Sequence, residues 1–317
     1  MNFYWWCLQE SNQGHKDFQS FALPTELRHH ALLGDLLSSK RVQIYSAFYF
    51  LAKEKQKKSF RTFAPIFAHT MNLVIDIGNT FIKLAVFQKN TLQEKILIQR
   101  QNFSAGLQNI FNEYHKSPYK IDKAILSSVA ETEIPWPDDL QVPPNLLILV
   151  PDTPLPFINR YKSPQTLGND RKALVAAAAQ QYPDSNVLVI DAGTCITYDF
   201  KNEQNEYLGG GISPGLQMRY NAMHHFTARL PKLEPVAEVN LIGDSTENSM
   251  HSGVVLGMAH EIDGLIAHYQ REHNSLKIIL TGGDAHFLSL QLKNTIFASS
   301  NFLVEGLNHI LEFNNIS

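Results

Sequence analysis

The chain has 317 residues, of which 44% are hydrophobic and 18% are charged, and its formal net charge at pH 7 is −3. That length is enough for roughly two domains that fold without disulfide or metal cross-links, and the charge gives no electrostatic basis for nucleic-acid binding. The two cysteines, Cys7 and Cys195, lack the paired spacing of a disulfide framework or a thiolate zinc site. We therefore expect a globular protein of the reducing cytoplasm.

No apolar run in the sequence is long enough to cross a membrane. Residues 1–10 are aromatic, but they lack the basic start, the apolar stretch and the small-residue cleavage site of a secretory signal. The sequence thus predicts neither membrane insertion nor export.

The first 70 residues differ in pattern from the rest of the chain. They contain a tryptophan pair, a histidine pair and a basic run at 53–58, and only 31–38 and 42–53 could form short helices. The segment is either a small appended domain or upstream sequence read through from an early start codon. We favour the second interpretation, because Met71 directly precedes the first regular strand, and we expect residues 1–70 to be poorly ordered.

The regular pattern begins with Leu73–Ile75, three apolar residues that predict a strand buried on both faces. Asp76 ends this strand, Gly78–Asn79 is a turn pair that tolerates positive φ, and Phe81–Gln88 predicts a second strand. Backbone N–H groups at such a turn can hold phosphate oxygens, and a carboxylate there can bind the waters of a Mg²⁺ ion. An ordinary hairpin with a capping aspartate would show the same local pattern.

A second copy of this pattern, Leu188–Thr194, precedes another strand-like run, Cys195–Phe200. The aspartates of the two copies, Asp76 and Asp191, are separated by about the length of one small domain. The repeat therefore predicts two related lobes, residues 71–185 and 186–317, that face each other across a nucleotide site.

Strand and helix patterns alternate between the two hairpins. The segment Ser104–His115 predicts a helix, whereas Ala124–Val129 and Leu146–Val150 predict strands, with a proline-rich connection between them. Such alternation is typical of an α/β protein with a mixed sheet.

A loop at Tyr161–Arg171 leads into an alanine-rich helix, Lys172–Gln181. Asp170 is either the N-cap of this helix or a base that faces the ligand, with Arg171 beside it as an anion-binding partner. Gly168 would let the backbone approach a ligand closely.

Glycine-containing segments follow the second hairpin. Tyr207–Gly215 predicts a glycine-rich turn before a helix at 216–225, whose first N–H groups suit an anion. Asn248–Tyr269 predicts a helix with small residues for close packing, within the chain or between subunits. Ile278–Leu280 predicts a buried strand that runs into Gly282–Gly283, a turn that could pass beneath an adenine or a ribose.

Familiar catalytic signatures are missing from the sequence. His260–Glu261 begins like a zinc-protease helix, but Gly264 stands where a second histidine is required. There is no Gly-x-Ser-x-Gly nucleophile turn, no phosphate-binding loop ending in Gly-Lys-Ser/Thr and no Rossmann glycine fingerprint. An ATP site in this chain needs another architecture.

Six motifs follow the order found in the type III pantothenate kinase family, which the chain resembles over residues 71 to about 306. They are Asp76–Thr80, Pro164–Arg171, Asp191–Thr197, Gly210–Gly215, Thr246–Gly253 and Thr281–Ala285. The resemblance implies an α/β fold of actin-like ATPase (ribonuclease H-like) type, with two related lobes, mixed sheets flanked by helices and a cleft between them. It also implies phosphorylation of pantothenate by ATP, the first step of coenzyme A synthesis. Cys195 is the visible variation, at a position where a small residue is usual.

The resemblance further implies roles for individual residues. The residues expected to bind ATP are Asp76, Ile77, Gly78, Asn79, Thr80, Phe81, Ile82 and Lys83, which would hold its phosphates, and Thr194. Those expected at pantothenate are Tyr161, Gly168, Asn169, Asp170, Arg171 and Thr246, with Asp170 accepting the proton of the substrate hydroxyl. Asp76 would bind Mg²⁺ through water, and Asp191 would bind the monovalent cation, K⁺ or NH₄⁺, on which the family depends.

By the same resemblance, the protein would be a homodimer with pantothenate bound near the subunit interface. Two alternatives stay open. One is a different enzyme of the same superfamily, such as a sugar kinase or a phosphatase of the exopolyphosphatase type, against which Leu167–Arg171 argues. The other is a non-catalytic regulatory protein, against which the presence of Asp76, Asp170 and Asp191 argues.

Overall fold

The computed structural model describes residues 69–114, 118–128, 136–137 and 140–315. The chain divides into two units, Met1–Pro65 and Ile66–Ser317, and all described residues belong to the second. The helices expected at 31–38 and 42–53, and the order of residues 1–68, lie outside the described residues, so those expectations stay predictions.

The first sheet has five strands in the order β3-β2-β1-β4-β5. Its strands are β1 (His69–Ile77), β2 (Ile82–Gln88), β3 (Thr91–Ile98), β4 (Tyr119–Ser128) and β5 (Asn145–Ile148). The first three strands form an antiparallel meander, and β4 and β5 add to β1 in parallel. The central strands are apolar because both of their faces are covered, as expected for parallel strands between helices.

The second sheet repeats this plan, in the order β11-β10-β7-β8-β9-β6. Its strands are β6 (Ile158–Asn159), β7 (Val187–Ala192), β8 (Cys195–Lys201), β9 (Glu206–Pro214), β10 (Lys277–Thr281) and β11 (Phe297–Ala298). Again an antiparallel meander, β7-β8-β9, is followed by parallel strands β10 and β11, with β6 added at the β9 edge. The internal duplication predicted from the two aspartate hairpins is therefore present in the topology.

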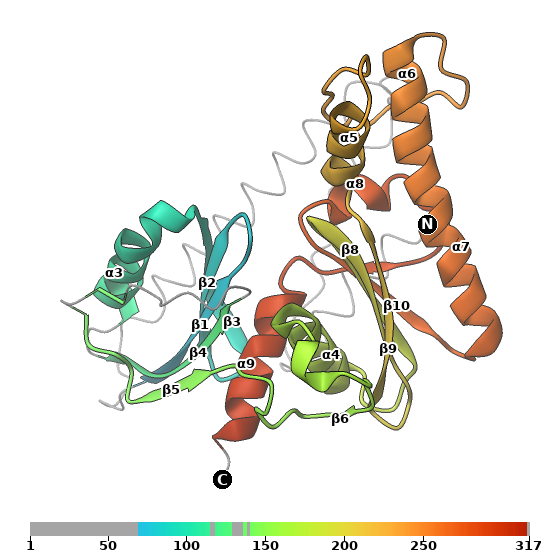
Figure 1. Ribbon diagram of the computed structural model, residues 1–317. Coiled ribbons are helices and arrows are strands. Elements are labelled where there is room, and N and C mark those ends of the chain that lie inside the picture. The colour runs from blue at the N-terminus through green and yellow to red at the C-terminus, as the bar shows by residue number, and fades with distance from the viewer. Residues whose placement is uncertain (1–68, 115–117, 129–135, 138–139, 316–317) are drawn as a thin grey trace, which may run out of the picture. The chain divides into compact units, whose positions relative to one another are not determined.

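Helices cover both faces of each sheet (Figure 1). They are α3 (Phe103–Tyr114), α4 (Asn169–Gln181), α5 (Leu216–His225), α6 (Thr246–His251), α7 (Gly257–Glu272), α8 (Ala285–Ser289) and α9 (Phe302–Asn314). A π-helical turn at Ser252–Leu256 joins α6 to α7. One core holds the outer face of the first sheet and α3, another the outer face of the second sheet with α5, α7 and α8.

The inner faces of the two sheets share a third core built around α4 and α9, which pack against each other (Figure 1). Helix α4 packs on β7 and β8, whereas α9, the last helix of the chain, packs on β1 and β4. The close contact depends on small residues: a Cβ at Gly306 would overlap the backbone carbonyl of Ala173. This pair of helices thus ties the two sheets into one unit.

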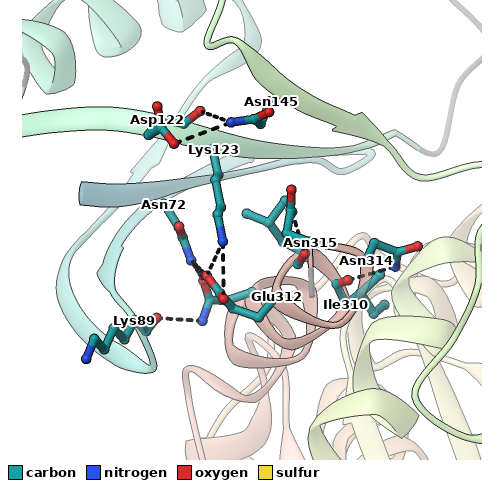
Figure 2. Close-up of polar contacts among 11 residues, drawn as sticks. Asn72, Lys89, Asp122, Lys123, Asn145, Ile310, Glu312, Asn314 and Asn315 are labelled. Carbon is teal, nitrogen blue, oxygen red and sulfur yellow. Dashed lines mark hydrogen bonds and ion pairs between the residues drawn. The ribbon is translucent and has the colours of Figure 1, made fainter. Parts of the chain in front are cut away.

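Polar contacts also hold α9 to the first sheet (Figure 2). The side-chain amide of Asn72 on β1 donates to Asn308 Oδ1 (2.8 Å) and to Glu312 Oε1 (2.6 Å). Asn308 Nδ2 donates in turn to the backbone carbonyl of Lys89 (2.9 Å), and Lys123 on β4 pairs with Glu312 (3.4 Å). Because Asn72 and Asn308 are buried, these mutual hydrogen bonds offset the cost of removing both amides from water.

One local prediction was wrong. The glycine-rich segment before α5 is part of strand β9 rather than a turn, because a side chain at Gly210 would overlap the carbonyl of Tyr198 on the adjacent strand. The turn predicted at Gly78–Asn79 is present between β1 and β2, and neither residue adopts a positive φ in it; among the described glycines, Gly209 and Gly282 do so. In the part of the chain that the structure describes, no helix is both long enough and apolar enough to cross a membrane.

Candidate active site

The first aspartate turn lies at the end of β1. Asp76 is 3% exposed, and its two neighbours across the strands, Lys83 on β2 and Ser127 on β4, both donate to its carboxylate. Lys83 Nζ is 3.0 Å from Oδ2, and Ser127 Oγ is 3.1 Å from Oδ1. The strand register thus fixes the carboxylate at the carboxyl end of β1, where the turn begins.

The turn itself is closed by a hydrogen bond from Gly78 N–H to the carbonyl of Phe81 (3.1 Å). Asn79, Thr80 and Phe81 are exposed, whereas Ile77 and Ile82 are buried in the outer core of the first sheet. Of the predicted ATP residues, Ile77 and Ile82 can therefore offer only backbone atoms to a ligand. The exposed backbone between them is available for phosphate oxygens.

The second turn, at the end of β7, is one residue shorter than the first. Gly193 N–H donates to the carbonyl of Cys195 (3.0 Å), Thr194 is exposed, and its carbonyl accepts from Gly215 N–H (3.2 Å). Gly282 has a φ of +100°, and a Cβ there would overlap the Asp191 carboxylate and the carbonyl of Ala192. The Gly-Gly segment after β10 is thus packed on the second aspartate turn.

Electrostatic interactions connect Asp191 to the other predicted carboxylates. Burial raises the pKa of Asp191 to about 6; Lys83 opposes this shift, and Asp170, Asp199 and Asp76 add to it. The contributing groups come from both hairpins and from α4. The structure therefore gathers Asp76, Asp170 and Asp191, the three carboxylates singled out in the sequence, into one charged region.

Asp170 is not the N-cap of α4, so that alternative is wrong. The N-cap position is Gly168, and Asp170 lies one residue into the helix, where its Oδ1 accepts from the backbone N–H of Arg171 (2.8 Å). A Cβ at Gly168 would collide with that same oxygen. Glycine at 168 thus makes room for the Asp170 carboxylate rather than, as the sequence predicts, for a ligand.

Arg171 is buried and lies beside two tyrosines. Its Nε donates to Asp199 Oδ1 on β8 (2.7 Å), and its Cζ lies 5.5 Å from the ring centre of Tyr161 and 6.0 Å from that of Tyr207. Burial opposes its charge, but Asp199 outweighs that effect and raises the pKa of Arg171. Its Nη2 is buried without a hydrogen-bond partner among the described residues.

Two other predicted substrate residues, Asn169 and Thr246, differ in their surroundings. Asn169 donates to the carbonyl of Leu149 (3.0 Å) and accepts from Lys172 Nζ (3.2 Å), so its side chain ties α4 to the end of β5. Thr246 is exposed in the first turn of α6, and α6 and α4 lie at opposite ends of the second sheet in Figure 1. Within one chain, the structure does not bring Thr246 to Asp170.

Sequence reasoning missed Ser127, Asp199 and Tyr207. Asp199 did have a signal: the run Cys195–Lys201 alternates, with polar residues at 197, 199 and 201, which places those three side chains on one face of the strand. Ser127 and Tyr207 had none, because their relevance depends on which strands pair with β1 and β8.

The duplicated sheet with paired carboxylate turns defines a protein of the actin-like ATPase class. The family model described as type III pantothenate kinase matches residues 72–268. A type III pantothenate kinase of Christiangramia forsetii is 52% identical over 244 residues, which is 77% of this chain and 99% of the relative. That of Phocaeicola vulgatus is 42% identical over 246 residues, with the same two coverages.

A solved structure from Campylobacter jejuni, described as a Baf family transcriptional activator, has a TM-score of 0.51 and 24% identity. It covers 77% of this chain and all of its own length, 100%, and at that identity it bears on the fold alone. With the family model matched over more than half of the chain, the chain belongs to the type III pantothenate kinase family.

Proposed function

We propose that this chain transfers the γ-phosphoryl group of ATP to the primary hydroxyl of pantothenate, giving 4′-phosphopantothenate. The observation that carries the proposal is the electrostatic group of Asp76, Asp170 and Asp191 around two phosphate-type turns, with Lys83 as its cation. Phosphoryl transfer depends on positioning and on neutralising the charge of the transferred group. The two turns, the three carboxylates and Lys83 lie where they could position ATP and, with bound cations, neutralise the charge of the transferred group.

ATP would lie with its phosphates on the two aspartate turns. Exposed backbone at Asn79–Phe81 and at Thr194 would donate to phosphate oxygens, and Lys83 would contribute a positive charge. Bound Mg²⁺ would neutralise phosphate charge, with Asp76 binding it through water. Among the described residues, no group of three or more His, Cys, Asp or Glu side chains could hold a metal alone, and Mg²⁺ in kinases ordinarily takes only one or two carboxylates besides water and phosphate.

Asp170 would accept the proton of the substrate hydroxyl. A primary alcohol loses its proton late, as the bond to phosphorus forms, so the carboxylate need not be strongly basic. Arg171 and Tyr161 would hold the carboxylate end of pantothenate, which is supported by the buried guanidinium nitrogen that has no partner among the described residues.

Asp191 would bind the monovalent cation, K⁺ or NH₄⁺. Its neighbours Asp170, Asp199 and Asp76 disfavour a bare carboxylate there, and a cation next to the carboxylate would relieve that repulsion.

We also propose that the enzyme is a homodimer of the cytoplasm. Thr246 is remote from Asp170 within one chain, and a partner subunit could supply it. Apolar side chains near α5 and α6 are unusually exposed for a monomer: Phe226 is 81%, Leu241 77% and Ile242 82% exposed. We expect a dimer by sedimentation velocity, and Ile242→Asp should shift the equilibrium toward monomer; a wild-type monomer at micromolar concentration would refute this part.

The test of the function is ADP release by the full chain with ATP and Mg²⁺. Pantothenate, glucose, mannose and no acceptor would be compared, each in K⁺ and in Na⁺. We expect ADP release only with pantothenate, at a higher rate in K⁺, with a product whose mass is that of 4′-phosphopantothenate. Turnover with a sugar but not with pantothenate would favour the sugar-kinase alternative, and no turnover with any acceptor would favour a regulatory protein.

A further inference from the structure

We infer that Asp199 is a positioning residue for substrate recognition: it orients the Arg171 guanidinium so that Nη2 is presented to the carboxylate of the substrate. The inference rests on the proposed function, because the anion in question is the carboxylate of pantothenate. Asp199 itself would not touch the substrate.

Hydrogen bonds fix the orientation of the Asp199 carboxylate. Its side chain is fully buried on β8. Oδ1 accepts from Arg171 Nε (2.7 Å) and from the hydroxyl of Tyr207 (2.7 Å), and Oδ2 accepts from Thr197 Oγ1 (3.0 Å). Three donors from three elements of the fold therefore fix the carboxylate in a single orientation.

The guanidinium is restrained from the other side by aromatic rings. Tyr161 and Tyr207 stack on each other at 5.8 Å with their planes 23° apart, and the Cζ of Arg171 lies within 6.0 Å of both ring centres. Because a guanidinium is planar, a bond at Nε together with these two rings determines where its terminal nitrogens point. The rotational freedom that an arginine normally has is thereby removed before any ligand arrives.

The Nη2 atom of Arg171 takes part in none of these hydrogen bonds. It is buried and has no hydrogen-bond partner in the part of the chain that is described. A buried donor without an acceptor is destabilising, so a fold that keeps one in place points to an acceptor that comes from a ligand. A carboxylate is the acceptor that best matches a charged guanidinium nitrogen.

The charges of Arg171 and Asp199 also favour recognition by a directed hydrogen bond. Arg171 and Asp199 neutralise each other, so the pair attracts an anion less by its net charge than by a directed hydrogen bond from Nη2. Directed hydrogen bonds depend steeply on angle. Losing the acceptors at position 199 should therefore weaken substrate binding, even though it would make this region more positive.

The test compares four variants of the full chain in steady-state kinetics. Asp199→Leu removes all acceptors; we expect the KM for pantothenate to rise about 30-fold or more, with kcat and the KM for ATP within about 3-fold of wild type. Asp199→Asn keeps a carbonyl for Arg171 and Tyr207 and an amide for Thr197, so we expect it to bring the KM back to within about 5-fold. If Asp199 acts through Arg171, then Arg171→Met and the double variant Arg171→Met/Asp199→Leu should share one KM.

Three results would overturn the inference: Asp199→Asn as impaired as Asp199→Leu, effects of the two positions that add in the double variant, or a KM for ATP that rises in parallel. Should Asp199→Leu not fold, Tyr207→Phe decides, because it keeps the ring and removes one bond to Asp199. We expect its KM for pantothenate to rise about 3- to 10-fold, while Tyr182→Phe, the same change at the other end of α4, leaves it unaltered. An unaltered KM in Tyr207→Phe refutes the inference.

The failure of this inference can be told from failure of the proposed function. A wild-type chain that does not phosphorylate pantothenate refutes the function. A wild-type chain that does so, with any of the overturning results above, refutes only the role of Asp199.

Discussion

The carboxylate of Asp170 accepts a hydrogen bond from the backbone N–H of Arg171 (2.8 Å). Asparagine at this position keeps that acceptor and the volume of the side chain, so Asp170→Asn should leave the start of α4 intact while removing the base. We expect kcat to fall by about 10²- to 10⁴-fold with a modest change in the KM for pantothenate. Steady-state kinetics measure both quantities, and a thermal melt checks the fold. Unchanged turnover would mean that Asp170 only stabilises the start of α4 and is not the base.

Asp191 should make stability depend on pH. Its pKa is raised from 3.8 to about 6, chiefly by burial, so the folded state holds this proton more tightly than the unfolded chain does. Between about pH 4 and pH 6 the unfolded chain loses the proton first, and the contribution of Asp191 to stability therefore falls as pH rises. Above pH 6 the deprotonated carboxylate costs up to about 3 kcal/mol.

The variant Asp191→Asn removes this cost. Without nucleotide, Mg²⁺ or K⁺, we expect it to unfold at higher urea concentration than wild type at pH 7.5, and the difference should vanish near pH 4. Adding K⁺ should then stabilise wild type more than the variant, because a cation stabilises only the charged side chain. A wild type that is the more stable of the two at pH 7.5 without cations would contradict the raised pKa.

At the scale of elements, the close packing of α4 against α9 predicts how a substitution at their contact changes stability. A methyl group at Gly306 would overlap the carbonyl of Ala173, and neither backbone can withdraw, since both helices are packed between the sheets. We expect Gly306→Ala to lower the free energy of unfolding by about 1–3 kcal/mol. The matched change Gly264→Ala, in α7, meets nothing within 4 Å and should raise stability by about 0.5–1 kcal/mol. Urea titrations of the two variants test the pair; equal effects would mean that the helices do not pack this closely.

The elements show where a sequence prediction succeeds and where it fails. Strands β1, β4, β7 and β10 follow from short apolar runs, and α5 has the predicted bounds. Helix α9 was missed although its less buried residues, 305, 309 and 312, recur on one face. Helix α4 gave no amphipathic signal, because its burial is not confined to one face: residues 171–179 are all buried. A helix enclosed between two sheets loses the apolar–polar period from which helices are normally predicted.

At the scale of the whole molecule, duplication was predictable and its geometry was not. Two aspartate turns in one chain implied two related lobes, and apart from the extra strand β6 the two sheets do share one strand order. That α4 packs on the second sheet and α9 on the first could not be derived, because such packing depends on contacts between residues far apart in sequence. For the same reason, Arg171 was predicted as an anion partner, but Asp199, which orients it, was not.

The start of strand β1 gives the last prediction. Strand β1 starts at His69, two residues before Met71. His69 pairs with Tyr119, its N–H donates to the carbonyl of Pro118 (2.7 Å), and its ring nitrogen bonds Gln88 (3.1 Å). The relatives match about three quarters of the chain, 77%, yet nearly all of their own length, 99%, so the shared part should carry the activity.

A chain that begins at Ile66, the first residue of the second unit, should keep kcat/KM for pantothenate within about 3-fold of the full chain. One that begins at Met71 should have the same kcat, but its free energy of unfolding should be lower by about 1–2 kcal/mol, because the first bonds of β1 are lost. Urea unfolding and steady-state kinetics on the three chains separate the two effects. A tenfold loss of kcat/KM in the chain from Ile66 would assign residues 1–65 a part in catalysis, contrary to the prediction.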